Sequence, residues 1–229
     1  MQPYDLTKET LVDAALAHVP FDGWSDATFA AAIRDSGADG TRARAVCPRG
    51  GLDLAIAFHK HGDAAMVEHL QDHDLGALRI RERIALAVRT RLEVVDDKDL
   101  VRRGTTLFAL PQNAGDGARL IWGTADAIWN ALGDPSRDIN WYTKRATLAG
   151  VYSATVLFWL GDDSPADQAS WSFLDRRIED VMRIEKAKAA VRNNPVLSRL
   201  MAGPNALLSR VRAPQPRPDF PGFWPDKDT

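Results

Sequence analysis

The sequence predicts an all-α protein, and three observations support this fold class. Apolar residues recur at three- and four-residue spacings along most of the 229-residue chain, as they do on the buried faces of amphipathic helices. No convincing run of alternating β-branched residues indicates a strand. Clusters of glycine and proline separate the helical segments. A chain of this length can form one large or two small domains with a substantial core.

The first 75 residues contain four short predicted helices. The first covers residues 7–18. The second follows Ser25, a favoured N-cap residue, and ends near Gly37, because glycine commonly follows the last turn of a helix. The third covers residues 41–46, and the fourth begins near Leu52. This order of short helices predicts a helix-turn-helix-like domain over residues 1–75.

The charge of these 75 residues is unfavourable for binding DNA. They carry six Lys/Arg against twelve Asp/Glu, whereas DNA-binding proteins gain most of their affinity by neutralising phosphates. Arg42 and Arg44 nevertheless occupy positions where a recognition helix contacts bases or backbone. We therefore do not expect nucleic acid to be a partner.

Residues 76–192 are expected to form a second helical domain. A helix over residues 78–95 has one apolar face, and its arginines are expected on the solvated side: Arg79, Arg81, Arg83, Arg89 and Arg91. A further helix ends near Leu110, and the next contains Trp122 and Trp129, which lie seven residues apart and hence on one face. A last core helix is predicted over residues 171–188.

The helix predicted over residues 138–160 combines an aromatic, cationic beginning with a long uncharged run. Trp141, Leu148 and Tyr152 share one face, whereas Ala146 and Gly150 lie on a flat face that another backbone could approach closely. The uncharged run is shorter than the about 20 apolar residues that span a bilayer. This pattern predicts a buried helix that forms core, a cavity wall or a subunit interface.

Residues 193–229 are expected to form an amphipathic helix followed by a proline-rich tail. Arginines occupy the polar face of residues 195–212, opposite a continuous apolar face. Such a helix can lie in the interface of an anionic bilayer, or it can pack back on the domain. The expected membrane-binding residues are Leu197, Leu200, Met201, Leu207, Leu208 and Val211. A balance of nine Lys/Arg to three Asp/Glu over residues 176–212 favours the membrane.

The chemistry-bearing residues do not form a known catalytic or metal-binding pattern. His69 and His73 have a spacing that can chelate a metal, but the sequence specifies no third ligand. We therefore expect no metal site, no cofactor and no catalytic residue. The single cysteine and the absence of a signal-like N-terminus lead us to expect a cytoplasmic protein, peripheral on the inner face of the cytoplasmic membrane.

Several longer motifs point to one family. The chain resembles the ubiquinone biosynthesis accessory family known as coenzyme Q protein nine, over residues 7–188. Its matching motifs lie in the family's order at residues 18–24, 89–92, 125–129, 133–134, 140–152 and 173–177.

This resemblance implies an all-α fold like that of TetR regulators: an N-terminal helix-turn-helix, a helical ligand-binding and dimerisation domain, and a C-terminal amphipathic helix. It also implies a non-catalytic homodimer that takes prenylated quinone precursors from the membrane and presents them to a ring hydroxylase. A bound lipid or isoprenoid quinone precursor is the expected ligand. The alternative function is a TetR-like, ligand-responsive transcription regulator.

The resemblance also assigns roles to residues. The partner-binding patch of the family corresponds to Trp141 and Tyr142, with Lys144 and Arg145 beside them. The membrane-binding helix corresponds in position and pattern to residues 195–212. For the lipid, we expect a wall that includes Leu148 and Tyr152. The remaining residues expected to bind lipid are Trp122 and Trp129.

Overall fold

The computed structural model describes residues 8–193 and 211–214 of the chain. In these two ranges the regular structure is entirely helical, so the prediction of an all-α protein is confirmed. None of the helices in this described part combines the length and apolar character needed to cross a membrane. The amphipathic helix expected over residues 195–212 lies almost wholly outside the described residues, and so does the proline-rich segment from residue 215 onward.

Four short helices form the N-terminal end of the molecule. They are α1 (Lys8–Ala15), α2 (Val19–Asp22), α3 (Asp26–Ser36) and α4 (Gly40–Val46). Ser25 caps α3 as predicted, because its Oγ accepts a hydrogen bond from the backbone N–H of Thr28 at 3.3 Å. Gly37 ends the same helix with a left-handed φ of 67°. Helix α2 was not predicted, because four residues are too few to show a helical periodicity.

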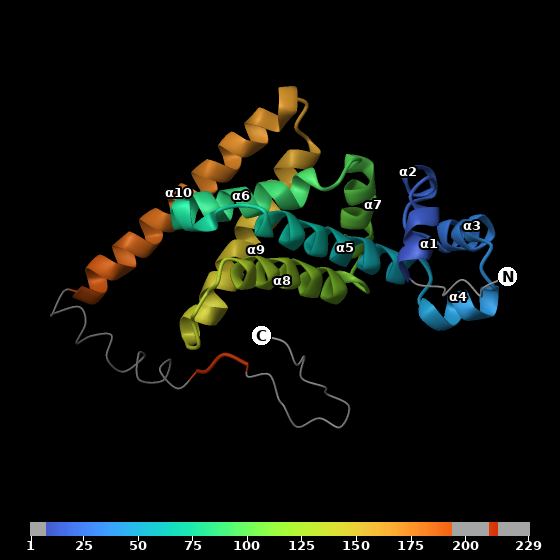
Figure 1. Cartoon of the computed structure of the whole chain (residues 1–229), viewed down its shortest axis with the longest axis horizontal. Helices are drawn as coiled ribbons and strands as arrows, with labels where there is room; N and C mark the ends of the chain where they lie inside the picture. Colours follow the sequence, from blue (N-terminus) through green and yellow to red (C-terminus); the bar gives the residue numbers. More distant parts are fainter. Residues whose placement is uncertain (1–7, 194–210, 215–229) are drawn as a thin grey trace.

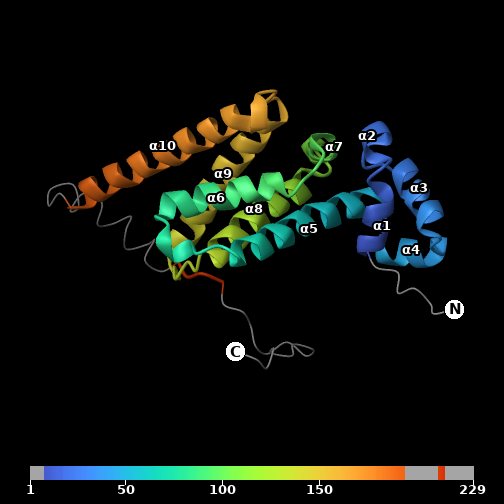
Figure 2. The same ribbon diagram turned by 45° about the horizontal axis from the view of Figure 1, so that its top comes forward.

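The rest of the molecule is built from longer helices. They are α5 (Gly51–Gln71), the 3₁₀ turn η1 (Leu75–Ala77), α6 (Ile80–Glu93), α7 (Lys98–Ala109), α8 (Ala114–Ala131), α9 (Ile139–Leu160), the 3₁₀ turn η2 (Pro165–Asp167) and α10 (Gln168–Asn193). Figures 1 and 2 show α1–α4 gathered at one end and α10 lying along α6 and α9.

Helix α5 joins the two ends of the molecule. Its first half contributes Leu54 to a core that includes Leu11 and Phe29, and its second half contributes Met66 and Leu70 to a larger core with α6, α8, α9 and α10. One continuous helix therefore takes part in both cores. The domain boundary expected between residues 75 and 76 stays a prediction.

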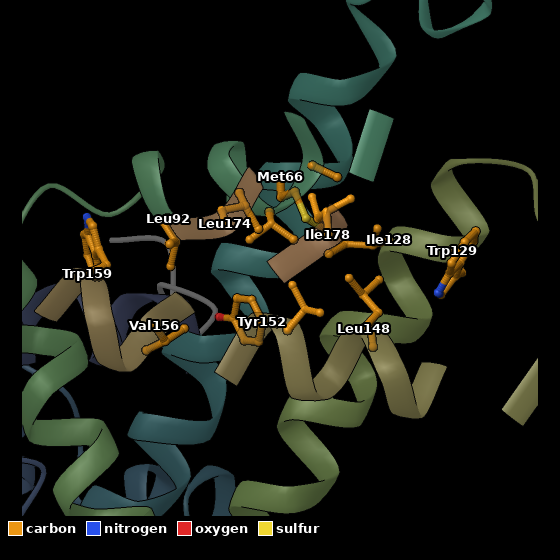
Figure 3. Packing of buried hydrophobic residues seen from close by; sticks show 14 of the residues in the cluster. Met66, Leu92, Ile128, Trp129, Leu148, Tyr152, Val156, Trp159, Leu174 and Ile178 are labelled. Atoms are coloured by element: carbon orange, nitrogen blue, oxygen red, sulfur yellow. The ribbon is translucent and has the colours of Figure 1, made fainter. Parts of the chain in front are cut away.

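Helix α9 is central to the larger core. Leu148, Tyr152 and Trp159 point into it, beside residues of α6, α8 and α10 (Figure 3). No described part of the chain packs on the flat face, because Ala146 and Gly150 are exposed and no atom lies within 4 Å of a Cβ built on Gly150. The close approach of another backbone therefore stays a prediction for a subunit interface. Helices α8 and α10 pack instead against the large side chains, which bury more apolar area.

One arginine of α6 also differs from its prediction. Arg79, Arg81 and Arg89 are exposed, as expected for a solvated face, but Arg91 is only 4% exposed. The helix turns this side chain inward, where it pairs with Asp63 of α5 at 2.6 Å. A buried charge requires such a partner, and periodicity within one helix does not reveal a partner on another.

Candidate ligand cavity and aromatic surface

A cavity of about 410 Å³ lies between helices α5 to α9. Its walls are mostly apolar and include Trp24, Phe58, Leu100, Phe108, Ile121 and Val156. Trp24 is held in the wall by a hydrogen bond from its Nε1 to the Leu100 carbonyl oxygen at 3.1 Å. A concave space of this size and composition is typical of a site for an apolar small molecule.

The exposure of the lining residues distinguishes the mouth of the cavity from its interior. Ala109 of α7, Ala118 of α8 and Leu157 of α9 line the cavity and are exposed; Leu157 is 62% exposed. Leu92 of α6 and Tyr152 of α9 line it and are buried. The cavity therefore opens between α7, α8 and α9, and its mouth has apolar edges.

A connected group of polar side chains lies at the buried part of the cavity. Arg91 donates from Nε to Asp63 Oδ1 at 2.6 Å and from Nη2 to the His59 carbonyl oxygen at 2.9 Å. Thr124 donates from Oγ1 to Asp63 Oδ1 at 2.9 Å, and its Oγ1 lies 2.8 Å from His59 Nε2. His59, Arg91 and Tyr152 belong to the lining of the cavity.

Burial determines the charge of this group. It lowers the pKa of His59 to about 4, with a further contribution from the positive charge of Arg91, so the imidazole is neutral near pH 7. Burial also raises the pKa of Tyr152, which therefore stays a phenol. Gly62 makes room for the arginine, because a Cβ at this position would lie 2.6 Å from Arg91 Nη1.

The four residues expected to bind lipid lie in three different environments. Tyr152 lines the cavity. Leu148 and Trp129 are instead packed in the core of the larger helical part, and Trp122 lies half-buried in an aromatic cluster away from the cavity lining. Their spacing placed Trp122 and Trp129 on one face of α8, but Trp122 contacts the Trp141 and Tyr142 rings, whereas Trp129 belongs to the larger core.

Sequence reasoning missed most of the cavity lining. Phe58, Phe108 and Ile121 come from three helices, and only the packing of these helices brings the residues together. One signal was available for the polar group: His59 and Asp63 are four apart on a helix with many apolar residues, which indicates a polar spot on a packed face.

A second candidate site is an aromatic cluster where α9 begins. The ring centroids of Trp141 and Tyr142 lie 4.8 Å apart, and Trp122 of α8 lies 6.0 Å from Trp141 and 6.5 Å from Tyr142. All three residues are half-buried, so part of each is accessible. Exposed aromatic groups of this kind are common in protein interfaces. We call these three residues the aromatic surface.

Arg145 does not lie on this surface, contrary to the expectation for a partner-binding residue. Its side chain is 1% exposed. Its Nε donates to Asp126 Oδ1 at 2.5 Å, its Nη1 to Asp134 Oδ2 at 3.1 Å, and its guanidinium lies 4.0 Å from the Trp141 ring centroid. Asp126, near the end of α8, and Asp134, just beyond α8, neutralise the buried charge of Arg145. The guanidinium therefore packs against the Trp141 ring from within the protein.

Lys144 is partly exposed but is engaged by the same carboxylate. Its Nζ donates to Asp134 Oδ1 at 2.7 Å and to Ser136 Oγ at 2.8 Å. Burial alone would raise the pKa of Asp134, yet the hydrogen bonds from Lys144, Ser136 and Arg145 hold that pKa below its usual value. Asp134 thus links both cations to the turn between α8 and α9.

Residues 211–214 lie against the beginning of α9. Tyr142 donates from its hydroxyl to the Arg212 carbonyl oxygen at 3.3 Å, and the Ala213 N–H donates to the Arg137 carbonyl oxygen at 3.0 Å. Val211 and Arg212 were expected to end the amphipathic helix, but both are non-helical. Instead of helical hydrogen bonds, the Arg212 carbonyl oxygen accepts from a side chain of α9 and the Ala213 N–H donates to the turn before α9.

His69 and His73, the pair considered for a metal, are both exposed. His69 Nδ1 lies 3.0 Å from the Ala65 carbonyl oxygen, and His73 Nδ1 lies 2.9 Å from the His69 carbonyl oxygen. Across residues 8–193 and 211–214, no group of three or more His, Cys, Asp or Glu side chains could hold a metal ion. The expectation that the whole chain binds no metal and no cofactor stays a prediction.

The fold defines the class first: the protein is all-α, with a fold like that of TetR regulators. The chain is similar to the crystal structure of a TetR transcriptional regulator from Nitrosomonas europaea ATCC 19718, with a TM-score of 0.62 and 17% sequence identity. The match covers 75% of this chain and 95% of the regulator. At this identity the similarity shows the fold alone, and it confirms the predicted TetR-like architecture.

The family resemblance is confirmed as well. Residues 114–185, which include α8 and α9, match the COQ9 family. The chain is 32% identical to the "Ubiquinone biosynthesis protein COQ9, mitochondrial" of Rattus norvegicus over 182 residues, covering 76% of this chain and 58% of that protein. It is 32% identical to the protein of the same name from Drosophila melanogaster over 186 residues, covering 79% and 57%.

A relative of the same name from Homo sapiens is 29% identical over 182 residues, covering 76% of this chain and 57% of that protein. The chain thus spans somewhat more than half the length of these relatives.

The names of the relatives correct the predicted location. The expectation of a protein on the inner face of the cytoplasmic membrane was wrong, because these proteins are named mitochondrial. A lone cysteine fits any reducing compartment and does not distinguish between them.

Proposed function

We propose that the protein is a non-catalytic, lipid-binding accessory protein of ubiquinone biosynthesis. The apolar cavity between α5 and α9 is the single observation that carries this proposal. The relatives named for ubiquinone biosynthesis support the choice of pathway. Prenylated quinone precursors are too apolar to leave a bilayer unaided, so the enzymes that modify them benefit from a protein that shields the apolar chain.

Lipid extraction followed by mass spectrometry tests whether the cavity holds such a ligand. Purified protein is expected to carry an isoprenoid or another lipid in a fixed ratio. Ser153→Phe, which places a ring in the cavity lining, is expected to reduce that ratio several-fold. Gly150→Phe adds the same ring on the exposed face of α9, where nothing lies within 4 Å, and is the matched control. Equal lipid content in both variants would contradict the proposed site.

The ring hydroxylase of the pathway is the proposed partner, and the aromatic surface is its proposed docking site. Trp122, Trp141 and Tyr142 offer accessible aromatic area on a rigid base formed by Arg145 and its two carboxylates. Rigid aromatic groups contribute much of the free energy of many interfaces. We propose that docking there places the cavity next to an enzyme that accepts its ligand.

A pull-down with the hydroxylase tests this docking site. Tyr142→Ala and Trp141→Ala are expected to reduce retention of the hydroxylase about tenfold or more, with helicity unchanged. Phe21→Ala is the control, because Phe21 is 82% exposed on α2, at the other end of the molecule. Normal retention of the hydroxylase by both variants would show that the aromatic surface is not part of the interface. An equal reduction by Phe21→Ala would show that the loss is not specific to the aromatic surface.

Residues 195–210, the part of the expected amphipathic helix that lies outside the described residues, are proposed to bring the protein to a membrane. Their apolar face is expected to enter the interfacial region while the arginines remain at the head groups. Leu200→Asp places a charge on that face, and Ser198→Asp places the same charge on the polar face. The first variant is expected to abolish co-sedimentation with anionic liposomes and the second to reduce it only modestly; equal losses would argue against an oriented helix.

A further inference from the structure

The buried part of the cavity contains an arginine whose hydrogen bonds are incomplete. Arg91 uses Nε for Asp63 and Nη2 for the His59 carbonyl oxygen, and no described residue accepts a hydrogen bond from its Nη1. The side chain is nonetheless buried and belongs to the cavity lining. An N–H without an acceptor in the protein can donate to a ligand oxygen that reaches it, and hydrogen bonds from a charged donor are stronger than those between neutral groups.

Two further polar side chains line the same part of the cavity. The His59 imidazole of α5 and the Tyr152 phenol of α9 both lie next to Thr124, and both residues line the cavity. In Figure 3 the Tyr152 ring lies between Val156 and Leu148, with its oxygen on the Val156 side, which is the side that lines the cavity. Three polar groups on three helices therefore face one small region of an otherwise apolar space.

The charges of this region select the kind of ligand. The positive charge of Arg91 is balanced by Asp63 at 2.6 Å, and the imidazole and the phenol are neutral near pH 7. A carboxylate or phosphate would lose its hydration without gaining an unbalanced positive charge, and it would approach Asp63. A neutral oxygen loses less on leaving water and can still accept a hydrogen bond from the guanidinium.

We infer that His59, Arg91 and Tyr152 form a head-group site for the neutral, oxygen-bearing head of an amphipathic ligand, such as a phenol or a ring carbonyl. The apolar chain of the ligand then extends along the cavity toward the mouth at Leu157. This inference rests on the proposed lipid-binding function and adds the orientation and the chemical class of the ligand.

The orientation has a consequence for ligand transfer. With the head at the buried end, the ring is shielded from any protein docked outside, and only the apolar chain reaches the mouth. The ligand therefore leaves chain first and head last, and chemistry on the ring follows release. The protein acts as a carrier that hands over its ligand, rather than as one wall of a shared active site.

Calorimetric titration of the full chain with three probes that carry the same octyl chain on a benzene ring tests the inference. The probes are 4-octylphenol, octylbenzene and 4-octylbenzoate. We expect 4-octylphenol to bind about tenfold more tightly than octylbenzene, since it gains a hydrogen bond to a buried charged donor. The carboxylate of 4-octylbenzoate is expected to give no tighter binding than octylbenzene.

Two variants assign the preference to residues. Tyr152→Phe removes only the hydroxyl, and Arg91→Lys keeps a charge opposite Asp63 but lacks the Nη groups. Each is expected to reduce the preference for 4-octylphenol several-fold while the affinity for octylbenzene, which also reports on folding, stays unchanged. Thr106→Val is the control, because Thr106 is exposed on α7 outside the cavity lining and its hydroxyl donates to the Arg102 carbonyl oxygen at 3.0 Å.

The outcomes separate the two proposals. Equal affinities of the wild-type protein for 4-octylphenol and octylbenzene, or a preference unchanged in both variants, would overturn the head-group site while leaving a lipid cavity intact. Tighter binding of 4-octylbenzoate than of 4-octylphenol would overturn the choice of a neutral head. Failure of every probe to bind would instead contradict the proposed lipid-binding function.

Discussion

Arg145 is the clearest case of a charged residue whose role depends on its neighbours. Its guanidinium is surrounded by Asp126, Asp134 and Asn130 and lies beneath the Trp141 ring. Removal of one member of a buried ion pair leaves the others desolvated and unpaired. The contacts that position the aromatic surface are therefore also contacts that stabilise the packing of α8 against α9.

Arg145→Gln is expected to lower the free energy of unfolding by about 3 kcal/mol or more, because two carboxylates lose a buried cation. Urea denaturation followed by circular dichroism measures the change. Arg183→Gln is the control: Arg183 is 68% exposed and forms only surface ion pairs, so a change below about 1 kcal/mol is expected. Similar values for both variants would contradict a structural role of Arg145.

His59 makes the stability of the fold depend on pH. Its pKa is about 4 in the folded protein, compared with an ordinary value of 6.5. As the pH falls from 6.5 toward 4, the unfolded chain binds a proton at His59 that the folded protein does not bind, so the free energy of unfolding decreases. The loss from this one residue is at most about 3 kcal/mol and is complete once the pH is below the folded-state pKa.

The comparison with His59→Gln isolates this effect, because all other titrating groups are shared. The wild-type protein is expected to lose stability relative to the variant between pH 6.5 and 4, and their difference is expected to be constant above pH 7. Urea midpoints measured at half-unit intervals give this difference. A difference that does not change with pH would show that His59 titrates normally in the folded protein.

At the scale of elements, the beginning of α5 determines how the N-terminal helices attach to the rest. Gly51 lies so close to the turn before α3 that a Cβ would be 2.5 Å from the Ser25 carbonyl oxygen and 2.7 Å from the Trp24 carbonyl oxygen. The Trp24 side chain in turn lines the cavity and donates to Leu100 of α7. A shift of α5 would therefore reach the wall of the cavity.

Gly51→Ala is expected to destabilise the protein by about 1–3 kcal/mol, since backbone atoms must move to admit the methyl group. Gly123→Ala on α8 is the matched control: nothing lies within 4 Å of its Cβ position, and alanine favours a helix over glycine by up to about 1 kcal/mol. Thermal unfolding compares the two. A stabilising Gly51→Ala would mean that α5 does not lie this close to Ser25.

For the whole molecule, the fold permits a regulator as well as a carrier, and charge is the property that distinguishes them. Helices α3 and α4 follow each other closely in the region predicted to form a helix-turn-helix-like domain, and Arg42 and Arg44 are exposed on α4. However, Arg44 lies 3.8 Å from Asp26, and acidic residues outnumber basic ones two to one over residues 1–75. Because residues 1–75 carry this excess of negative charge, we expect DNA phosphates to repel the N-terminal helices.

The full-length protein is accordingly expected to cause no specific mobility shift of DNA at physiological salt, near 0.15 M. Weak retardation that disappears with added salt and does not depend on sequence would be consistent with this expectation. A sequence-specific shift that persists at that salt concentration would favour the alternative of a ligand-responsive regulator.

The sequence predicted the helices well but did not predict how their residues combine into sites. Ser25 and Gly37 bounded α3 correctly because capping depends on neighbouring residues alone. Tyr152 was correctly expected on a buried face, but Trp122 and Trp129 were assigned to one face and have separate roles. Helical periodicity indicates which side of a helix is apolar and does not indicate which helix covers it.

The all-α class, most helix boundaries and the family resemblance can be predicted from the sequence, because they depend on local spacing, caps and contiguous motifs. The structure was needed to show that Arg91 and Arg145 are buried cations, that the cavity is lined mainly by five helices, and that its polar residues meet at the buried end. Burial of a charge and the shape of a cavity depend on contacts between residues distant in the chain, and local spacing does not reveal these contacts.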